Sequence, residues 1–106
     1  MQPLNNQTLI AIAKKYGTPL YVYHAEKIKA QFLQLTRAFE NTNTQFFYAC
    51  KALTNINILK YIGKLGCNVD CSSINEVLLA LHAGIPANRI LYTSNGIAFD
   101  EIEAAV

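Results

Sequence analysis

Lys51 is the residue of this 106-residue sequence whose type and position best suit chemistry. It directly follows the apolar run 46–50, which reads as a buried strand, so it stands at the strand's C-terminal end. In α/β folds, functional sites are built at that end of the strands. Partial burial there would disfavour the charged amine, and the neutral amine is the form that makes Schiff bases with carbonyl groups. The alternative interpretation is a lysine that ends the strand and reaches solvent without a role.

Two carboxylates follow at the next strand end. Asp70 lies near the end of a second short run, 67–71, where it could orient the Lys51 amine and favour its protonated form. The alternative is an acid that caps the following turn. Glu76 stands three residues after Ser73, which is the spacing of a helix capping box, and that spacing accounts for both residues without a ligand. Asn95 lies in the turn signal 94–96 and is a further, equally ambiguous candidate.

The three cysteines, Cys50, Cys67 and Cys71, form no recognisable metal or disulfide pattern. Cys67 and Cys71 are spaced C-x3-C, but no second pair of Cys or His completes the four ligands of a structural zinc site. An odd number of cysteines without a signal peptide argues against a disulfide framework. We therefore expect no metal site, and three reduced thiols that pack as small hydrophobic side chains.

An alternation of apolar runs and helical patterns must position these residues. Apolar runs at 45–50, 67–71 and 89–93 read as strands. Between them, one helix is expected from about residue 56 to a stop at Gly66, and another from Ser73 to the stop signals Gly84 and Pro86. Two further helices are expected, one over about 25–39 and one from about residue 100. This order favours a parallel sheet with right-handed crossovers.

Two architectures have this order of elements: a complete doubly wound domain and a piece of a (β/α)8 barrel. A barrel needs about 250 residues, and the sequence stops soon after its last helix begins, which favours a piece. Before these elements, Gly17 and Pro19 indicate a turn. Residues 20–23 read as a strand, which need not belong to the same sheet.

The composition and charge exclude several classes of protein. Hydrophobic residues make up 52% and charged residues 15%, which is globular composition. The net charge is +2 with no block of like charges, so we expect no nucleic-acid partner and no membrane-surface binding. No apolar run is long enough to span a membrane, and the first residues lack a signal-peptide pattern. The expected location is the cytoplasm.

Four segments, in order and at suitable spacing, resemble the fold-type III pyridoxal-phosphate (PLP) decarboxylases, which act on diaminopimelate, ornithine and arginine. Residues 47–53, FYACKAL, resemble the family's F-Y-A-x-K-A-N motif. Residues 17–23, GTPLYVY, resemble the opening most typical of the diaminopimelate enzymes. Residues 69–76, VDCSSINE, resemble the D-x-x-S-x-x-E segment, and 90–95, ILYTSN, resemble the third barrel strand with its Asn.

The resemblance implies an α/β fold that is a partial PLP-binding TIM barrel. Residues 24–106 would form its first three β/α units, and the strand in residues 1–23 would belong to a C-terminal β-domain. Lys51 would be the catalytic lysine and hold PLP covalently as a Schiff base, with Ala49, Asp70 and Glu76 beside the cofactor. The whole enzyme would be a homodimer that converts meso-diaminopimelate, a small amino-acid substrate, to L-lysine and CO2.

Three departures from the family motifs leave the substrate assignment open. Leu53 replaces the usual Asn, Ile97 a common Lys, and residues 74–75 a common Gly-Gly. An ornithine- or arginine-type decarboxylase therefore remains an alternative. The family's phosphate loop and β-domain lie beyond these residues, so the isolated chain is expected to be inactive.

Two alternatives come from outside the enzyme class. A non-catalytic binding or regulatory protein derived from the barrel is one, and the intact Lys51 and Asp70 speak against it. A small doubly wound domain for another ligand is the other, but the sequence contains no G-x-G-x-x-G and no P-loop to support it.

Overall fold

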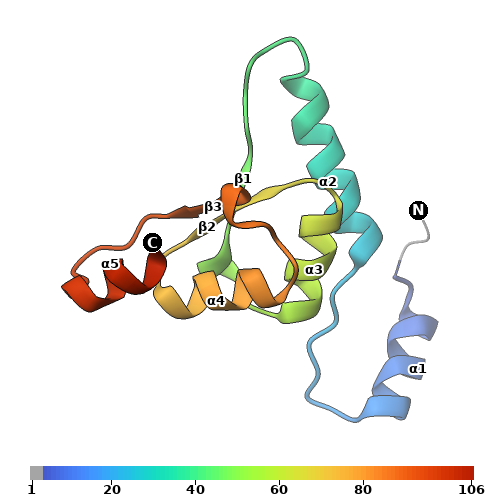
Figure 1. The fold of residues 1–106 in the computed structure, drawn as a ribbon. Coiled ribbons are helices and arrows are strands. Elements are labelled where there is room, and N and C mark those ends of the chain that lie inside the picture. Colours follow the sequence, from blue (N-terminus) through green and yellow to red (C-terminus); the bar gives the residue numbers. More distant parts are fainter. Residues whose placement is uncertain (1–3) are drawn as a thin grey trace. The chain divides into compact units, whose positions relative to one another are not determined.

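The computed structural model describes residues 4–106, and the chain divides into two compact units, Met1–Arg37 and Ala38–Val106. The first unit contains α1 (Asn6–Tyr16) and nearly all of α2 (Ala25–Ala38). The second unit contains a sheet and the helices α3 (Ile56–Lys64), α4 (Ile74–His82) and α5 (Phe99–Ala105), as Figure 1 shows. The four helices expected from the sequence are therefore all present.

The sheet has three parallel strands in the order β1-β2-β3. They are β1 (Phe47–Ala49), β2 (Asn68–Cys71) and β3 (Ile90–Tyr92), each shorter than the apolar run that predicted it. Short 3-10 turns border the outer strands, η1 (Cys50–Ala52) after β1 and η2 (Ala87–Arg89) before β3. The predicted β-α-β-α-β order and the parallel sheet are confirmed.

Local signals set the ends of the two crossover helices. The side chain of Asn55 caps α3 and accepts the backbone N–H of Asn57 at 3.0 Å. Ser73 caps α4, as its Oγ accepts the backbone N–H of Glu76 at 3.2 Å. Both helices are followed by glycines with positive φ, 92° at Gly66 and 87° at Gly84, where a side chain would strain the backbone.

The core lies between one face of the sheet and the helices α3 and α4. Its buried residues come from the strands, both helices and the loop after α4, namely Cys50, Leu59, Val69, Cys71, Val77, Ala80 and Ile85. On the opposite face, Phe47 and Leu91 are 40% and 45% exposed, so the apolar runs that predicted the strands are buried on one face only in this chain. Right-handed crossovers between strands in sequential order place both helices on the same side, which leaves the second face open.

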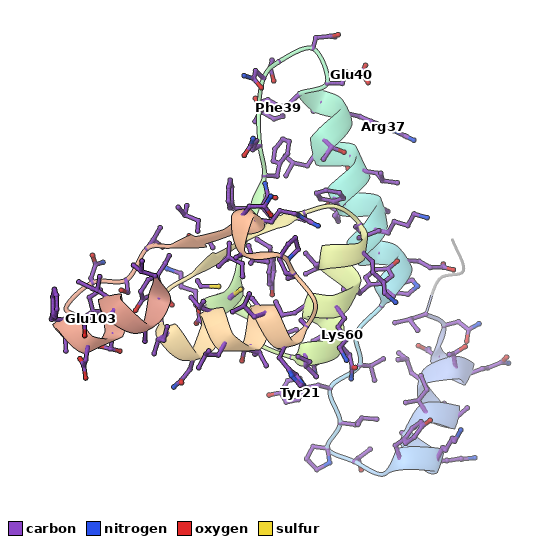
Figure 2. The ribbon with its side chains drawn as sticks, viewed as in Figure 1. Tyr21, Arg37, Phe39, Glu40, Lys60 and Glu103 are labelled. Carbon is purple, nitrogen blue, oxygen red and sulfur yellow. The ribbon has the colours of Figure 1, made fainter. Side chains whose placement is uncertain are left out.

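Arg89, in η2, ties the start of β3 to α3 and β2 within the second unit. Its guanidinium donates hydrogen bonds to the carbonyls of Gly63 and Cys67 and to the side-chain oxygen of Asn68. One side chain thus connects the end of α3, the loop before β2 and β2 itself. By contrast, Lys60 of α3 and Glu103 of α5 are exposed (Figure 2).

The first unit differs from the sequence prediction in two ways. Helix α1 was not predicted, although Asn5 is its N-cap, accepting the N–H of Thr8 at 2.8 Å, and Gly17 with φ 85° ends it. Residues 20–23 form no strand within residues 4–106, and their four side chains are exposed. Their place as a strand of a β-domain stays a prediction. A strand requires a hydrogen-bonded neighbour, and local β-propensity cannot supply one.

None of the helices in residues 4–106 has both the length and the apolarity needed to cross a bilayer.

Candidate active site

Lys51 lies in η1, one residue beyond the end of the paired part of β1. The backbone around it is fixed: Leu53 N–H donates to the Cys50 carbonyl at 3.1 Å, and the Tyr48 hydroxyl donates to the Leu53 carbonyl at 3.0 Å. The Lys51 residue itself is exposed, so the expected partial burial is not met in this chain. The 3-10 turn carries the lysine past the sheet, with its position held and its amine accessible.

Asp70 pairs with Ala49 across β1 and β2, which places both residues on the open face of the sheet. Its carboxylate accepts a short hydrogen bond from the Thr93 hydroxyl, and Thr93 is itself held by a 2.9 Å bond from its N–H to the Cys71 carbonyl. Residues 4–106 include both Asp70 and Lys51, and no ion pair joins them. The structure therefore brings Asp70 beside Ala49 and Thr93, with Lys51 at the adjoining edge.

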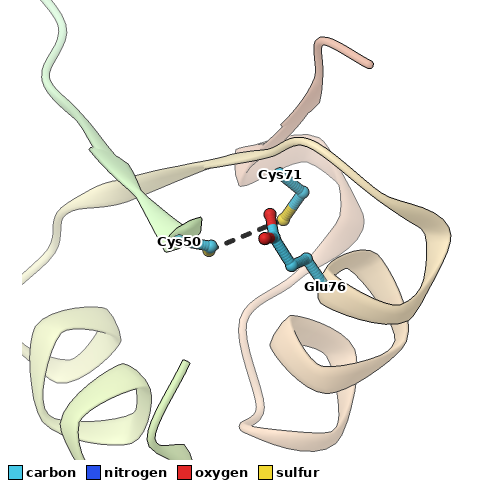
Figure 3. A group of neighbouring side chains, drawn as sticks. All are labelled: Cys50, Cys71 and Glu76. Carbon is cyan, nitrogen blue, oxygen red and sulfur yellow. Dashed lines mark hydrogen bonds between the residues drawn. The ribbon is translucent and has the colours of Figure 1, made fainter. Parts of the chain in front are cut away.

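Glu76 has a different setting. Its carboxylate accepts the backbone N–H of Ser72 at 2.6 Å and the Ser72 hydroxyl at 3.1 Å. The Ser73 side chain caps the helix, as the capping-box interpretation expected, but the returning bond from Glu76 goes to Ser72 instead of Ser73. The carboxylate also lies near the sulfurs of Cys50 and Cys71, on the side of the sheet that packs against α3 and α4 (Figure 3).

The thiols of Cys50 and Cys71 form a buried pair that the sequence analysis missed. Their sulfurs are 3.7 Å apart, and neither residue has exposed surface. Burial raises the pKa of Cys50, and burial together with the neighbouring Cys50 thiol raises the pKa of Cys71 to about 12. The signal that could have found this pair is the strand register: Ala49 pairs with Asp70, so the next residues, Cys50 and Cys71, are also opposite one another.

The arrangement suits an aldehyde-bearing cofactor. An accessible primary amine can bond to an aldehyde carbon, and Lys51 presents one at the carboxyl edge of a parallel sheet. Ala49, which is small, and Asp70, which is a hydrogen-bonded carboxylate, lie on the open face beside that edge. Lys51, Ala49 and Asp70 are thus of suitable type and place for PLP, whereas Glu76 lies on the opposite, helix-packed side of the sheet. The roles of all four residues stay predictions.

The chain belongs to the pyridoxal-dependent decarboxylase family: the pyridoxal binding domain of that family matches residues 25–106. Diaminopimelate decarboxylase of Methanothermobacter thermautotrophicus is 40% identical over 99 residues, which are 92% of this chain and 23% of the relative. The L-glutamyl-[BtrI acyl-carrier protein] decarboxylase of Niallia circulans is 35% identical over 103 residues, which are 97% of this chain and 24% of that relative.

The fold agrees with solved structures of the same family. The crystal structure of diaminopimelate decarboxylase from Helicobacter pylori, complexed with L-lysine, matches with a TM-score of 0.85 and 37% identity. The match covers 92% of this chain and 25% of that chain, so the chain spans about a quarter of the length of its relatives. The expected fold, a partial PLP-binding TIM barrel, and the expected cofactor, pyridoxal phosphate, are confirmed.

Proposed function

We propose that this chain is the N-terminal part of a diaminopimelate decarboxylase, which releases CO2 from meso-diaminopimelate and forms L-lysine. The observation that carries the proposal is the place of Lys51. Its amine is accessible, its backbone is fixed by η1, and it stands at the carboxyl edge of the sheet in a chain of a pyridoxal-binding family. The relatives named above support the substrate, because two of the three carry the name diaminopimelate decarboxylase.

In this proposal, Lys51 holds PLP through a covalent bond to its Nζ atom. When bound, PLP accepts the electron pair left behind as CO2 departs. Ala49 leaves room for a planar ring over the open face, and Asp70 presents a carboxylate oriented by Thr93 to the same face. Glu76 contributes by holding Ser72, and with it the loop between β2 and α4, at the same end of the sheet.

The proposal extends to the whole enzyme. Residues 24–106 would be the start of the barrel and residues 1–23 a segment completed by a β-domain, with two subunits sharing each active site. The isolated chain is then expected to be inactive. We place the enzyme in the cytoplasm, and its three free, buried cysteines agree with a reducing compartment.

The test uses the full-length protein that contains this chain. Borohydride reduction should attach the cofactor to the peptide that carries Lys51, as detected by mass spectrometry. Lys51→Ala should lose the cofactor's visible absorbance and the release of CO2, because no other amine replaces the fixed Lys51. Lys60→Ala, at an exposed lysine of α3, is the matched control and should retain both. Attachment of the cofactor to another lysine would overturn the assignment.

Substrate comparison separates the remaining candidates. The wild-type enzyme should release CO2 fastest from meso-diaminopimelate, and much more slowly from ornithine, arginine and glutamate linked to an acyl-carrier protein. The last is included because of the relative from Niallia circulans. A preference for any other of these substrates would reassign the enzyme within its family. No PLP absorbance and no turnover at all would favour the non-catalytic alternative.

A further inference from the structure

A cluster of three ligand-type side chains lies on the face of the sheet that packs against α3 and α4, opposite the face that carries Ala49 and Asp70. Cys50 begins η1 directly after β1, Cys71 ends β2, and Glu76 lies in the first turn of α4. The two sulfurs and a carboxylate oxygen all lie within 4.8 Å of one another, and Figure 3 shows the three side chains converging. The sulfurs are fully buried, whereas Glu76 is half-buried and lies nearest to solvent.

The spacing of the sulfurs suits one metal ion. Zinc binds thiolate sulfur at about 2.3 Å in tetrahedral geometry, which separates two sulfurs by about 3.8 Å. The Cys50 and Cys71 sulfurs are 3.7 Å apart, so both could bind one ion without movement of the strands. Glu76 supplies a carboxylate oxygen as the third ligand, and zinc sites with three protein ligands take water as the fourth.

The carboxylate is also oriented as metal-binding carboxylates are. Ser72 donates both its backbone N–H and its hydroxyl to Glu76, and such outer hydrogen bonds hold a ligand in place. Neither the register of the strands nor the helix cap needs a carboxylate there, because Ser73 caps α4 by itself.

We propose that Cys50, Cys71 and Glu76 bind a thiophilic divalent cation of the zinc type. Each thiol gives its proton to solvent as its sulfur bonds to the ion. The bound ion joins the carboxyl ends of β1 and β2 to the first turn of α4, directly beside Lys51. It therefore acts as a structural clamp on the edge of the sheet that carries the lysine.

The test uses the full-length protein, freed of metal and then loaded with Zn2+, Cd2+ or Co2+. The wild type should bind one equivalent more than Cys50→Ser or Cys71→Ser, show thiolate-to-metal charge-transfer bands, and unfold at a higher temperature with Zn2+ than without. Cys67→Ser is the matched control, since Cys67 is buried but lies outside the cluster, and it should behave as the wild type. Ser72→Ala should weaken binding by about 10- to 100-fold.

Two further variants keep the test decisive. If the cysteine variants do not fold, Glu76→Gln decides, because Gln preserves the size of a half-buried side chain and can still accept from Ser72. It should weaken Zn2+ binding at least about tenfold. Lys51→Ala should bind Zn2+ as the wild type does, so failure of the PLP assignment and failure of the metal site are distinguishable. Equal metal content and equal spectra in the wild type and the folded cluster variants would overturn the proposal.

Discussion

At the scale of single residues, the bond from Thr93 to Asp70 connects the ends of β2 and β3 on the open face. We predict that Thr93→Val lowers the free energy of unfolding by about 0.5–1 kcal/mol, because the Asp70 carboxylate loses a donor while half-buried. Thr93→Ser keeps the hydroxyl and should stay close to the wild type. Urea unfolding measures both, and an equal loss in the two variants would contradict the stabilising role of the Thr93 hydroxyl.

The site illustrates which residue properties a sequence can predict. Lys51 was found because a residue after an apolar run stands at a strand end, which is a local property. Its exposure depends on η1, a 3-10 turn that the apolar run did not reveal. The pairing of Cys50 with Cys71 depends on the strand register, which the spacing of cysteines along the sequence does not contain.

At the scale of elements, α3 approaches the loop after α4 closely at Gly63. A Cβ atom there would lie 2.9 Å from Cγ1 of Ile85, which is only 2% exposed. Glycine-to-alanine changes within helices usually stabilise by about 1 kcal/mol. We predict the opposite sign for Gly63→Ala, because overpacking costs about 1–3 kcal/mol. In an Ile85→Ala background the same change should become neutral or stabilising, and a thermal-unfolding cycle measures the difference.

A second prediction at the scale of elements concerns the hydrogen bonds of Arg89. Arg89→Ala removes three hydrogen bonds that join α3, the loop before β2 and β2, so we expect a loss of about 1–3 kcal/mol in unfolding free energy. Arg37→Ala, at an exposed arginine, should change it by less than about 0.5 kcal/mol. Chemical denaturation compares the two, and a similar loss in both would show that the Arg89 contacts contribute little.

Helices and strands differed in how well the sequence predicted them. The ends of α3 and α4 follow from Asn55, Ser73 and the glycines behind them, all of which act within a few residues. The segment 20–23 has the composition of a strand, but a strand also needs a neighbour from elsewhere in a chain. Helix α1 was missed because Gly17 was interpreted as punctuation before that strand, whereas it ends the helix.

At the scale of the whole molecule, buried thiols make the free energy of unfolding decrease at alkaline pH. Burial raises the pKa of Cys67 above its ordinary value of 9.0. Below pH 9 both folded and unfolded chains keep the proton, and above it the unfolded chain ionises first, so stability falls as pH rises. We predict that Cys67→Ala lowers stability through lost packing at every pH but flattens the decline above pH 9. Urea unfolding over a pH series measures that slope, and an unchanged slope would contradict the prediction.

The equal spacing of the strands has a consequence for how the protein is made. Phe47 pairs with Asn68 and Val69 with Ile90, and cross-strand partners such as Cys50 and Cys71 stand 21 residues apart. Because domains form from the N-terminus during synthesis, each strand can join its predecessor soon after it leaves the ribosome. In the proposed full-length barrel, the free edge of β3 would then be the template for the next strand.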